Sequence, residues 1–238
     1  MRWLKDQIPR NWRLAAQLLK RQVLDQQVAR EGLFATATDE LPVFTYFIEQ
    51  QQPIRSGEHL ANKLHNLRLG SQAINTILIQ PGQVFSFWRS VGAPTRERGF
   101  LESRNLVKGE LIAETGGGLC QLSGILYLLA LRAGLEVIER HHHSIDIYTE
   151  AERFCPLGAD ATVVYGYKDL RIRNSSAFPI AFNVRVFADS LLAQLKGASP
   201  LPDYPLTFER VSLPGKIEVK TLRGEGAESK VVATSCYR

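Results

Sequence analysis

Residues 119–134 read LCQLSGILYLLALRAG and contain the most apolar run of the chain, which covers residues 125–131. This pattern leaves almost no polar face, so we expect one helix over residues 119–133, ended by Gly134 as a C-cap residue. A helix that is apolar on nearly every side has to lie inside a core. The sequence therefore predicts a fold built around one buried central helix.

Strand-forming segments follow this helix. Residues 136–150, 161–174 and 178–197 are rich in β-branched and aromatic residues between turn signals, and they predict three or four strands. Residues 216–238 predict a further hairpin. The predicted helix precedes the predicted strands along the chain, and this order is typical of α+β proteins. We therefore expect a mostly antiparallel or mixed sheet packed against the buried helix.

The chain before the central helix is less regular. Residues 11–30 carry apolar residues near a helical period and predict a basic surface helix, whereas residues 31–56 read as loop and short extended pieces. Residues 59–75 predict a second helix. We therefore expect residues 1–56 to be an N-terminal helical and linker extension and residues 57–238 to be the main domain.

Composition narrows the class of protein. The chain has 238 residues, of which 45% are apolar and 22% are charged, as in a globular domain with one sizeable core. Its net charge of +5 is spread thinly, and we expect no nucleic-acid partner. Because charged residues interrupt every long apolar run, we expect neither a signal peptide nor a membrane span, and therefore a cytoplasmic location. Peripheral membrane contact through the basic helix at residues 11–30 is the alternative.

Cysteine occurs three times, as Cys120, Cys155 and Cys236. So few cysteines, in an odd number, do not form the disulfide framework of a small secreted domain, and this favours a reducing compartment. Only Cys120 follows a glycine-rich helix entry, which makes it the candidate for a reactive thiol.

The segment TGGGLCQLS, residues 115–123, delivers three glycines directly into the first turn of the buried helix. Gly117 and Gly118 permit positive φ angles and close approach, and the first-turn amides can hold an oxyanion. Cys120 lies near the positive end of the helix dipole, which favours the thiolate form of its side chain. Two plainer interpretations remain open, namely an anion-binding loop and a small buried cysteine, although no Lys-Ser/Thr pair follows the glycines.

A histidine cluster, ERHHHSID at residues 139–146, supplies proton partners for such a thiol. If the cluster is extended, His141 and His143 share one face and His142 points to the other. The third member of a catalytic set, which would hold the imidazole, is Asp146 or Asp160. The competing interpretations are solvent-facing histidines and a zinc site made by the two same-face histidines with a carboxylate or a cysteine.

Three strings of this sequence together resemble the VanW domain, a family linked to vancomycin-resistance clusters and cell-wall proteins. They are PGQVFSFW at residues 81–88, GGGLCQLS at residues 116–123 and ERHHHS at residues 139–144, and the resemblance covers about residues 66–197. The resemblance implies a link to peptidoglycan and, in some extracytoplasmic members, L,D-transpeptidase activity through the cysteine.

Carried over residue by residue, the resemblance implies that Cys120 is the nucleophile and His143 its base, with His141 as the other candidate. Asp160 matches the acidic residue of a G-x-DAT pattern, whereas Asp146 matches shorter members of the family. The candidate oxyanion or substrate-binding residues are Gly117, Gly118, Gln121, Trp88 and Arg140.

The hypothesis that follows is a cysteine acyl-transfer enzyme, similar to a transpeptidase or an amidase, with peptidoglycan peptide or its precursors as partner. It needs no cofactor and no metal. The alternatives are a non-catalytic module that binds cell-wall peptide or glycopeptide, and a zinc-dependent site at the histidine cluster.

Overall fold

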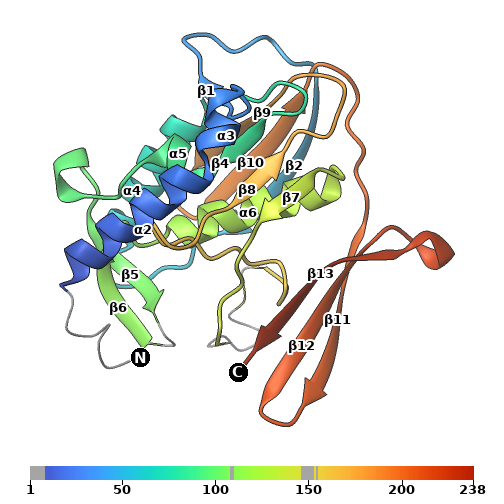
Figure 1. The fold of residues 1–238 in the computed structure, drawn as a ribbon. Helices are drawn as coiled ribbons and strands as arrows, with labels where there is room; N and C mark the ends of the chain where they lie inside the picture. The colour runs from blue at the N-terminus through green and yellow to red at the C-terminus, as the bar shows by residue number, and fades with distance from the viewer. Residues whose placement is uncertain (1–8, 108–109, 146–152, 154) are drawn as a thin grey trace.

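A computed structural model of the chain describes residues 9–107, 110–145, 153 and 155–238. It confirms the expected α+β fold, in which helices pack against antiparallel sheets (Figure 1). Asp146, one of the two candidate acidic residues, lies outside the described residues.

The helix α6 (Leu119–Arg132) forms the centre of the fold and is buried from Gln121 to Leu131. Leu122, Ile125 and Leu126 are fully buried. The helix ends where predicted, because Gly134 follows with a φ of 75°, which a glycine adopts without strain. The prediction of one buried central helix is therefore confirmed.

One sheet covers α6 with strands β2 (Tyr46–Pro53), β10 (Ser190–Gly197) and β9 (Ile180–Val186), in the order β2-β10-β9. All of its pairings are antiparallel. The helix α4 (Leu60–Ile74) packs on β9, and α6 packs on β10 and β2, so both helices lie on this sheet (Figure 1).

A second antiparallel sheet contains β4 (Val84–Ser86), β8 (Arg171–Arg173) and β7 (Glu136–Glu139), in the order β4-β8-β7. The strand β7 contacts α6, and the rings of Phe85 and Phe182 meet edge to face across the two sheets at 5.3 Å. The aromatic contact joins both sheets into one core.

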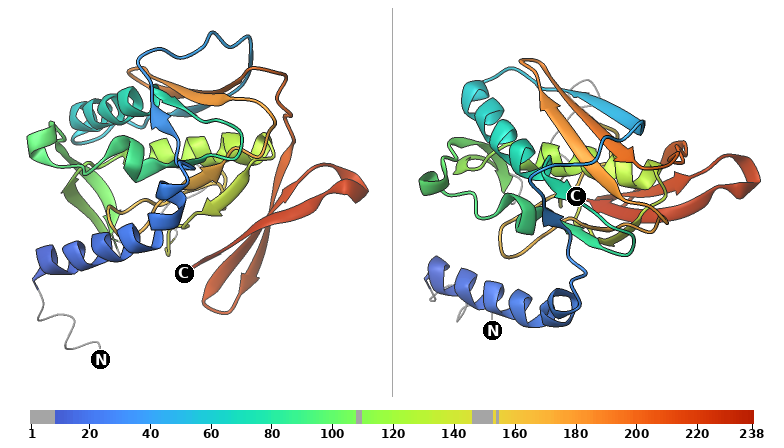
Figure 2. Two further views of the ribbon diagram at one scale, coloured as in Figure 1. Left: turned by 45° about the horizontal axis from the view of Figure 1, so that its top comes forward. Right: turned by 90° about the horizontal axis from the view of Figure 1, so that it is seen from above.

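The remaining elements surround this core. They are α2 (Arg10–Leu24), α3 (Gln26–Arg30), β1 (Thr36–Ala37), β3 (Ile77–Leu78), α5 (Phe87–Val91), β5 (Glu102–Val107), β6 (Glu110–Thr115), β11 (Leu206–Leu213), β12 (Lys216–Arg223), β13 (Lys230–Tyr237) and the short 3₁₀ helices Arg96–Arg98 and Gly226–Glu228. The strands β11 to β13 form a third sheet, drawn in red, which projects from the body (Figure 2). The expected C-terminal hairpin is thus part of a three-stranded sheet.

Two predicted strand segments contain less strand than expected in their described residues. Of residues 136–150 only β7 is a described strand, and of residues 161–174 only β8. The imidazole rings of the histidine segment instead bond to the carboxylates of Glu139 and Asp160 and to the carbonyl of His143 within the segment. After β4, Ser86 accepts a hydrogen bond from the amide of Arg89 and caps the short helix α5.

The expected boundary at residue 56 cuts through the first sheet. The strand β2 lies before this boundary and pairs with β10 along its whole length. Ile48 and Ile54 are buried in the main core, and the buried Phe34 forms a bridge with Val84. Residues from about 34 onward therefore belong to the main domain, because they supply part of its sheet and core.

The N-terminal helix α2 lies against the body from outside, as Figure 2 shows. Arg21 forms two hydrogen bonds with the carboxylate of Glu139, and Arg171 forms two with Asp25. On the outer face of α2, Trp12 is 70% exposed. No helix in the described part of the chain is long and apolar enough to cross a membrane.

We predict that removing residues 1–56 abolishes cooperative unfolding, whereas removing residues 1–30 preserves it. The longer deletion removes β2 and two buried isoleucines, while the shorter one removes only helices docked on the surface. Urea unfolding followed by circular dichroism distinguishes these outcomes. A cooperative transition in the longer deletion would contradict the assignment of β2 to the core.

Candidate functional site

The glycine turn between β6 and α6 places Cys120 in the first turn of the buried helix. Gly116 and Gly118 have φ values of 85° and 100°, whereas Gly117 lies outside the positive-φ region, in contrast to the expectation for that residue. A Cβ atom on Gly116 would lie 2.7 Å from the Cβ atom of Pro94, so the turn has no room for a side chain there. The glycines therefore fix the path of the chain into the helix.

The sulfur of Cys120 lies at the amino end of α6, where backbone amides point outward. The amides of Leu119 and Gln121 donate to the carbonyls of Gly116 and Gly118 at 3.4 and 2.9 Å. Within the described residues no acceptor is bonded to the amide of Cys120 itself. This amide is therefore available to a negatively charged oxygen beside the sulfur.

His143 is held beside Cys120 by Asp160. Its Nδ1 lies 2.8 Å from Oδ2 of Asp160, and its backbone amide donates to the same oxygen at 2.6 Å. Cys120 is close enough to the ring to raise the pKa of His143, and the sulfur of Cys120 lies 3.7 Å from the carbonyl oxygen of Val163. The structure thus brings Cys120, His143 and Asp160 together in the order that a cysteine nucleophile, its proton carrier and an orienting carboxylate require.

The electrostatics of this group favour a protonated imidazole. Burial lowers the pKa of His143, but the hydrogen bonds and negative charges of Asp160 and Cys120 outweigh burial and raise that pKa to about 10. At neutral pH the ring of His143 therefore carries a proton and faces the sulfur of Cys120. Such an arrangement allows a proton to pass between the ring and a group bound at the sulfur.

The carboxylate of Asp160 is surrounded by donors. Burial raises its pKa, but the hydrogen bond from His143 and the charge of Arg140 outweigh burial and hold the pKa of Asp160 well below its usual range. Nη2 of Arg140 lies 3.2 Å from Oδ1, and the hydroxyl of Tyr237 donates to the same oxygen. Asp160 is therefore an ionised, oriented acceptor.

The other two histidines have different partners. Nε2 of His141 lies 2.9 Å from the carboxylate of Glu139, and Nδ1 of His142 lies 2.7 Å from the carbonyl of His143. Among the described residues no group of three His, Cys, Asp or Glu side chains is arranged to hold a metal ion. The structure therefore places His143, and not His141, at the cysteine.

Cys120 and His143 open into a cleft of about 590 Å³. Its walls come from α5, the glycine turn, the loop at residues 162–168 and α2. The lining side chains or backbone include Leu14, Trp88, Pro94, Glu114, Gly116, Thr162, Val163, Tyr165, Tyr167 and Lys168. A cleft of this size accommodates a short peptide or a molecule of similar size.

Aromatic side chains make one wall of the cleft. Trp88 packs edge to face with Tyr165 at 5.5 Å and donates its indole N–H to the carbonyl of Lys168 at 2.8 Å. Tyr167 also lines the cleft. Trp88 thus lines the cleft, and its substrate-binding role stays a prediction.

Gln121 and Arg140 do not line the cleft, in contrast to the expectation that they contact an oxyanion or substrate. The buried amide of Gln121 donates to the carbonyl of Pro53 at 2.9 Å. The guanidinium of Arg140, 8% exposed, bonds to Asp160 and to the carbonyl of Gly158. Both side chains turn away because buried backbone and carboxylate acceptors bind their N–H groups, although Oε1 of Gln121 has no hydrogen-bond partner in the described structure.

Two contributions to the site have no signal in the local sequence. Leu14 of α2 lines the cleft, and Arg21 of the same helix donates to the carbonyls of Gly166 and Tyr167 in the cleft loop. Tyr237 reaches Asp160 from the last strand of the chain. Both contributions arise from tertiary contacts between distant segments.

Comparison with known proteins identifies relatives of the chain. A family model described as VanW like protein matches residues 62–196. The protein named "Uncharacterized protein YoaR" of Bacillus subtilis is 32% identical over 169 residues, which are 71% of this chain and 52% of that protein. The "Vancomycin B-type resistance protein VanW" of Enterococcus faecalis is 35% identical over 115 residues, or 48% of this chain and 42% of that protein.

The chain spans about half the length of the curated relatives it matches. No solved structure matches it. The matched family range contains Cys120, His143 and Asp160, and it excludes α2 and the strands β11 to β13.

We predict that Cys120 is alkylated faster than Cys155 and Cys236 in the folded protein. Cys120 faces the cleft beside a protonated imidazole, whereas burial raises the pKa of Cys155 to about 12 and keeps that thiol protonated at neutral pH. Iodoacetamide labelling at pH 7 with peptide mapping measures the three rates, with denatured protein as the control. Faster labelling of Cys155 or Cys236 in the folded state would contradict the assignment of Cys120.

Proposed function

This chain belongs to the VanW family, and we propose that it is a cysteine-dependent acyl-transfer enzyme acting on peptide bonds of peptidoglycan or its precursors. The observation that carries this proposal is the group of Cys120, His143 and Asp160 at the base of an open cleft. Its cell-wall substrate class is supported by the name of the relative from Enterococcus faecalis and by the sequence resemblance described above.

In the first step the thiolate of Cys120 attacks the carbonyl carbon of a peptide bond, and a C–S bond forms. The electron pair of the C=O bond moves to oxygen, where the free amide of Cys120 and the end of the helix dipole stabilise the negative charge. The C–N bond then breaks, and the leaving amine takes the proton of His143.

In the second step an amine or water attacks the thioester. His143, now neutral, accepts the proton of the incoming nucleophile, and Asp160 stabilises the imidazolium that forms again. The C–S bond breaks, and the thiolate of Cys120 returns. An amine acceptor makes the reaction a transpeptidation, and water makes it a hydrolysis.

The cleft walls suit a peptide substrate. Trp88 and Tyr165 offer flat apolar surfaces on one side, and Lys168, a residue with an ammonium group, is among the lining residues. Aromatic faces pack on aliphatic side chains, and an ammonium group binds a terminal carboxylate. A short wall peptide with a free carboxyl end carries both features.

The same aromatic wall favours a second candidate function. A module that binds cell-wall peptide or glycopeptide without chemistry needs a cleft with aromatic surfaces and does not need an activated thiol. The two functions therefore differ in whether Cys120 forms a covalent bond with the bound peptide.

We predict that incubation with peptidoglycan stem peptides gives an acyl adduct on Cys120. The adduct appears in the intact mass of the protein as the acyl part of the peptide and is lost on treatment with hydroxylamine. Replacing His143 with alanine slows adduct formation by about 100-fold or more, the usual contribution of a positioned acid–base group.

Cys155→Ser is the matched control, because it removes a half-buried thiol that lies outside the cleft. This variant should form the adduct at the wild-type rate, and Cys120→Ala should form none. Binding of the peptide in the cleft without any adduct would contradict the enzyme and support the binding module.

A further inference from the structure

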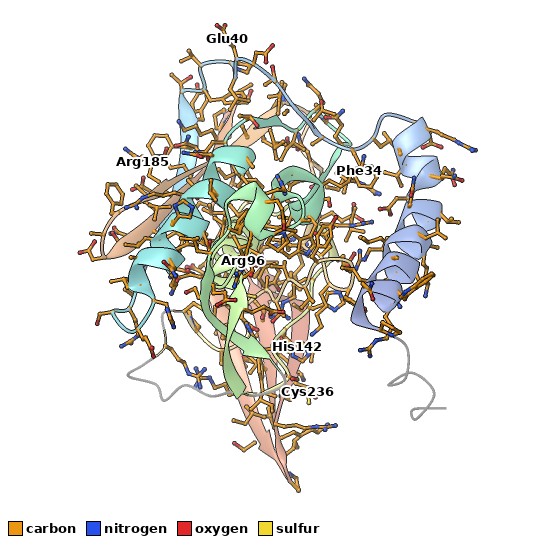
Figure 3. The ribbon with its side chains drawn as sticks, turned by 90° about the vertical axis from the view of Figure 1, so that its left-hand side faces the viewer. Phe34, Glu40, Arg96, His142, Arg185 and Cys236 are labelled. Carbon is orange, nitrogen blue, oxygen red and sulfur yellow. The ribbon has the colours of Figure 1, made fainter. Side chains whose placement is uncertain are left out.

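The last strand of the chain reaches the candidate site from outside the matched family range. The backbone amide of Cys236 in β13 lies 3.4 Å from Nε2 of His142, and Figure 3 shows these two residues beside each other. The amide of Arg238 donates to the carbonyl of Ser144 at 3.0 Å. The end of β13 is therefore fastened to the segment that carries His143.

Tyr237 is the central contact of this attachment. Its side chain is 1% exposed, its hydroxyl donates to Oδ1 of Asp160, and the same hydroxyl accepts from the amide of Gly158 at 3.0 Å. Its ring packs on that of His142 at 5.1 Å. Burial and the charge of Asp160 raise the pKa of Tyr237, so the hydroxyl remains a donor at neutral pH.

A second contact from β13 acts through Arg140. The buried hydroxyl of Ser235 accepts from Nη1 of Arg140 at 2.6 Å, while the rest of the guanidinium bonds to Asp160 and Gly158. Both donors to Oδ1 of Asp160, Tyr237 and Arg140, are therefore held by the same strand.

We propose that β13 positions the catalytic pair, with Tyr237 as the residue that orients Asp160 and, through it, the ring of His143 toward Cys120. This inference rests on the proposed function. The carboxylate has two oxygens, and His143 uses Oδ2 while Tyr237 and Arg140 use Oδ1. Fixing Oδ1 fixes the rotation of the carboxylate, and that rotation sets the direction of the hydrogen bond to His143.

A purely structural role for Tyr237 makes a different prediction. Its ring packs with Leu157 and Val219 in a small apolar cluster beneath β11 to β13. Phenylalanine fills the same space, so a packing role survives Tyr237→Phe, whereas the orientation of Asp160 does not. The titratable groups that interact with Asp160 in the described chain are His143, Arg140, Tyr237, Cys155 and Tyr127, and the substitution removes only one of them.

The test is the rate of Cys120 alkylation by iodoacetamide between pH 5 and 9 in the full chain. We expect Tyr237→Phe to slow alkylation at pH 7 about tenfold, the effect of a lost hydrogen bond to a charged group. We also expect the pH profile of alkylation to move upward by about one unit, because a less supported imidazolium stabilises the thiolate less.

Tyr127→Phe is the matched control. Tyr127 is equally buried and its ring lies under the guanidinium of Arg140 at 4.8 Å, but its hydroxyl has no partner in the described structure. This variant should keep the wild-type rate and pH profile. The control separates the loss of a tyrosine hydroxyl near Arg140 from the loss of the contact with Asp160.

His143→Ala, measured in the same series, distinguishes a failure of this inference from a failure of the proposed function. If His143→Ala slows alkylation and Tyr237→Phe leaves rate and profile unchanged, the positioning role of β13 is overturned. If neither variant has an effect, the activation of Cys120 by His143 fails, and the proposed function fails with it. Ser235→Ala is the second variant if Tyr237→Phe does not fold, and an unchanged profile there also overturns the inference.

Discussion

A helix that is apolar on every side has to be buried, and the burial of α6 determines the rest of this structure. Two sheets and α4 supply the surfaces that cover it. The glycine turn before α6 packs closely against Pro94 and places the first turn of the helix at the cleft. The first turn of a buried helix thus becomes the one place where its unpaired amides and Cys120 meet a solvent-accessible space.

Burial also explains the charges around Cys120. A carboxylate such as Asp160 is costly inside a protein unless donors surround it, and here His143, Arg140 and Tyr237 do so. The raised pKa of His143 stabilises the fold fully below about pH 6.5, and this contribution is lost as pH rises through about 10. The lowered pKa of Asp160 acts in the opposite direction, since its contribution is lost as pH falls below its ordinary value of 3.8.

The sequence predicted the elements whose patterns are local and strong. The helix at Leu119–Arg132 has an unmistakable apolar run, and the glycine turn before it singled out Cys120. The family resemblance favoured His143 over His141, but strand alternation could not separate them, because the difference depends on which ring reaches Asp160 across a loop. The contact of Tyr237 with Asp160 could not be predicted from the sequence either, since 77 residues separate the two and no local pattern marks such a contact.

The membership of β2 in the core was missed for a similar reason. Its sequence, YFIEQQQP, is largely polar, and only its pairing with β10 reveals it as a strand.

The central claim, an imidazolium at His143 beside the Cys120 sulfur, is tested most directly by ¹⁵N NMR titration of the histidine rings, with His143→Gln used for assignment. The account predicts that His143 stays protonated through neutral pH and titrates near pH 10. Titration near its ordinary pKa of 6.5 would contradict it.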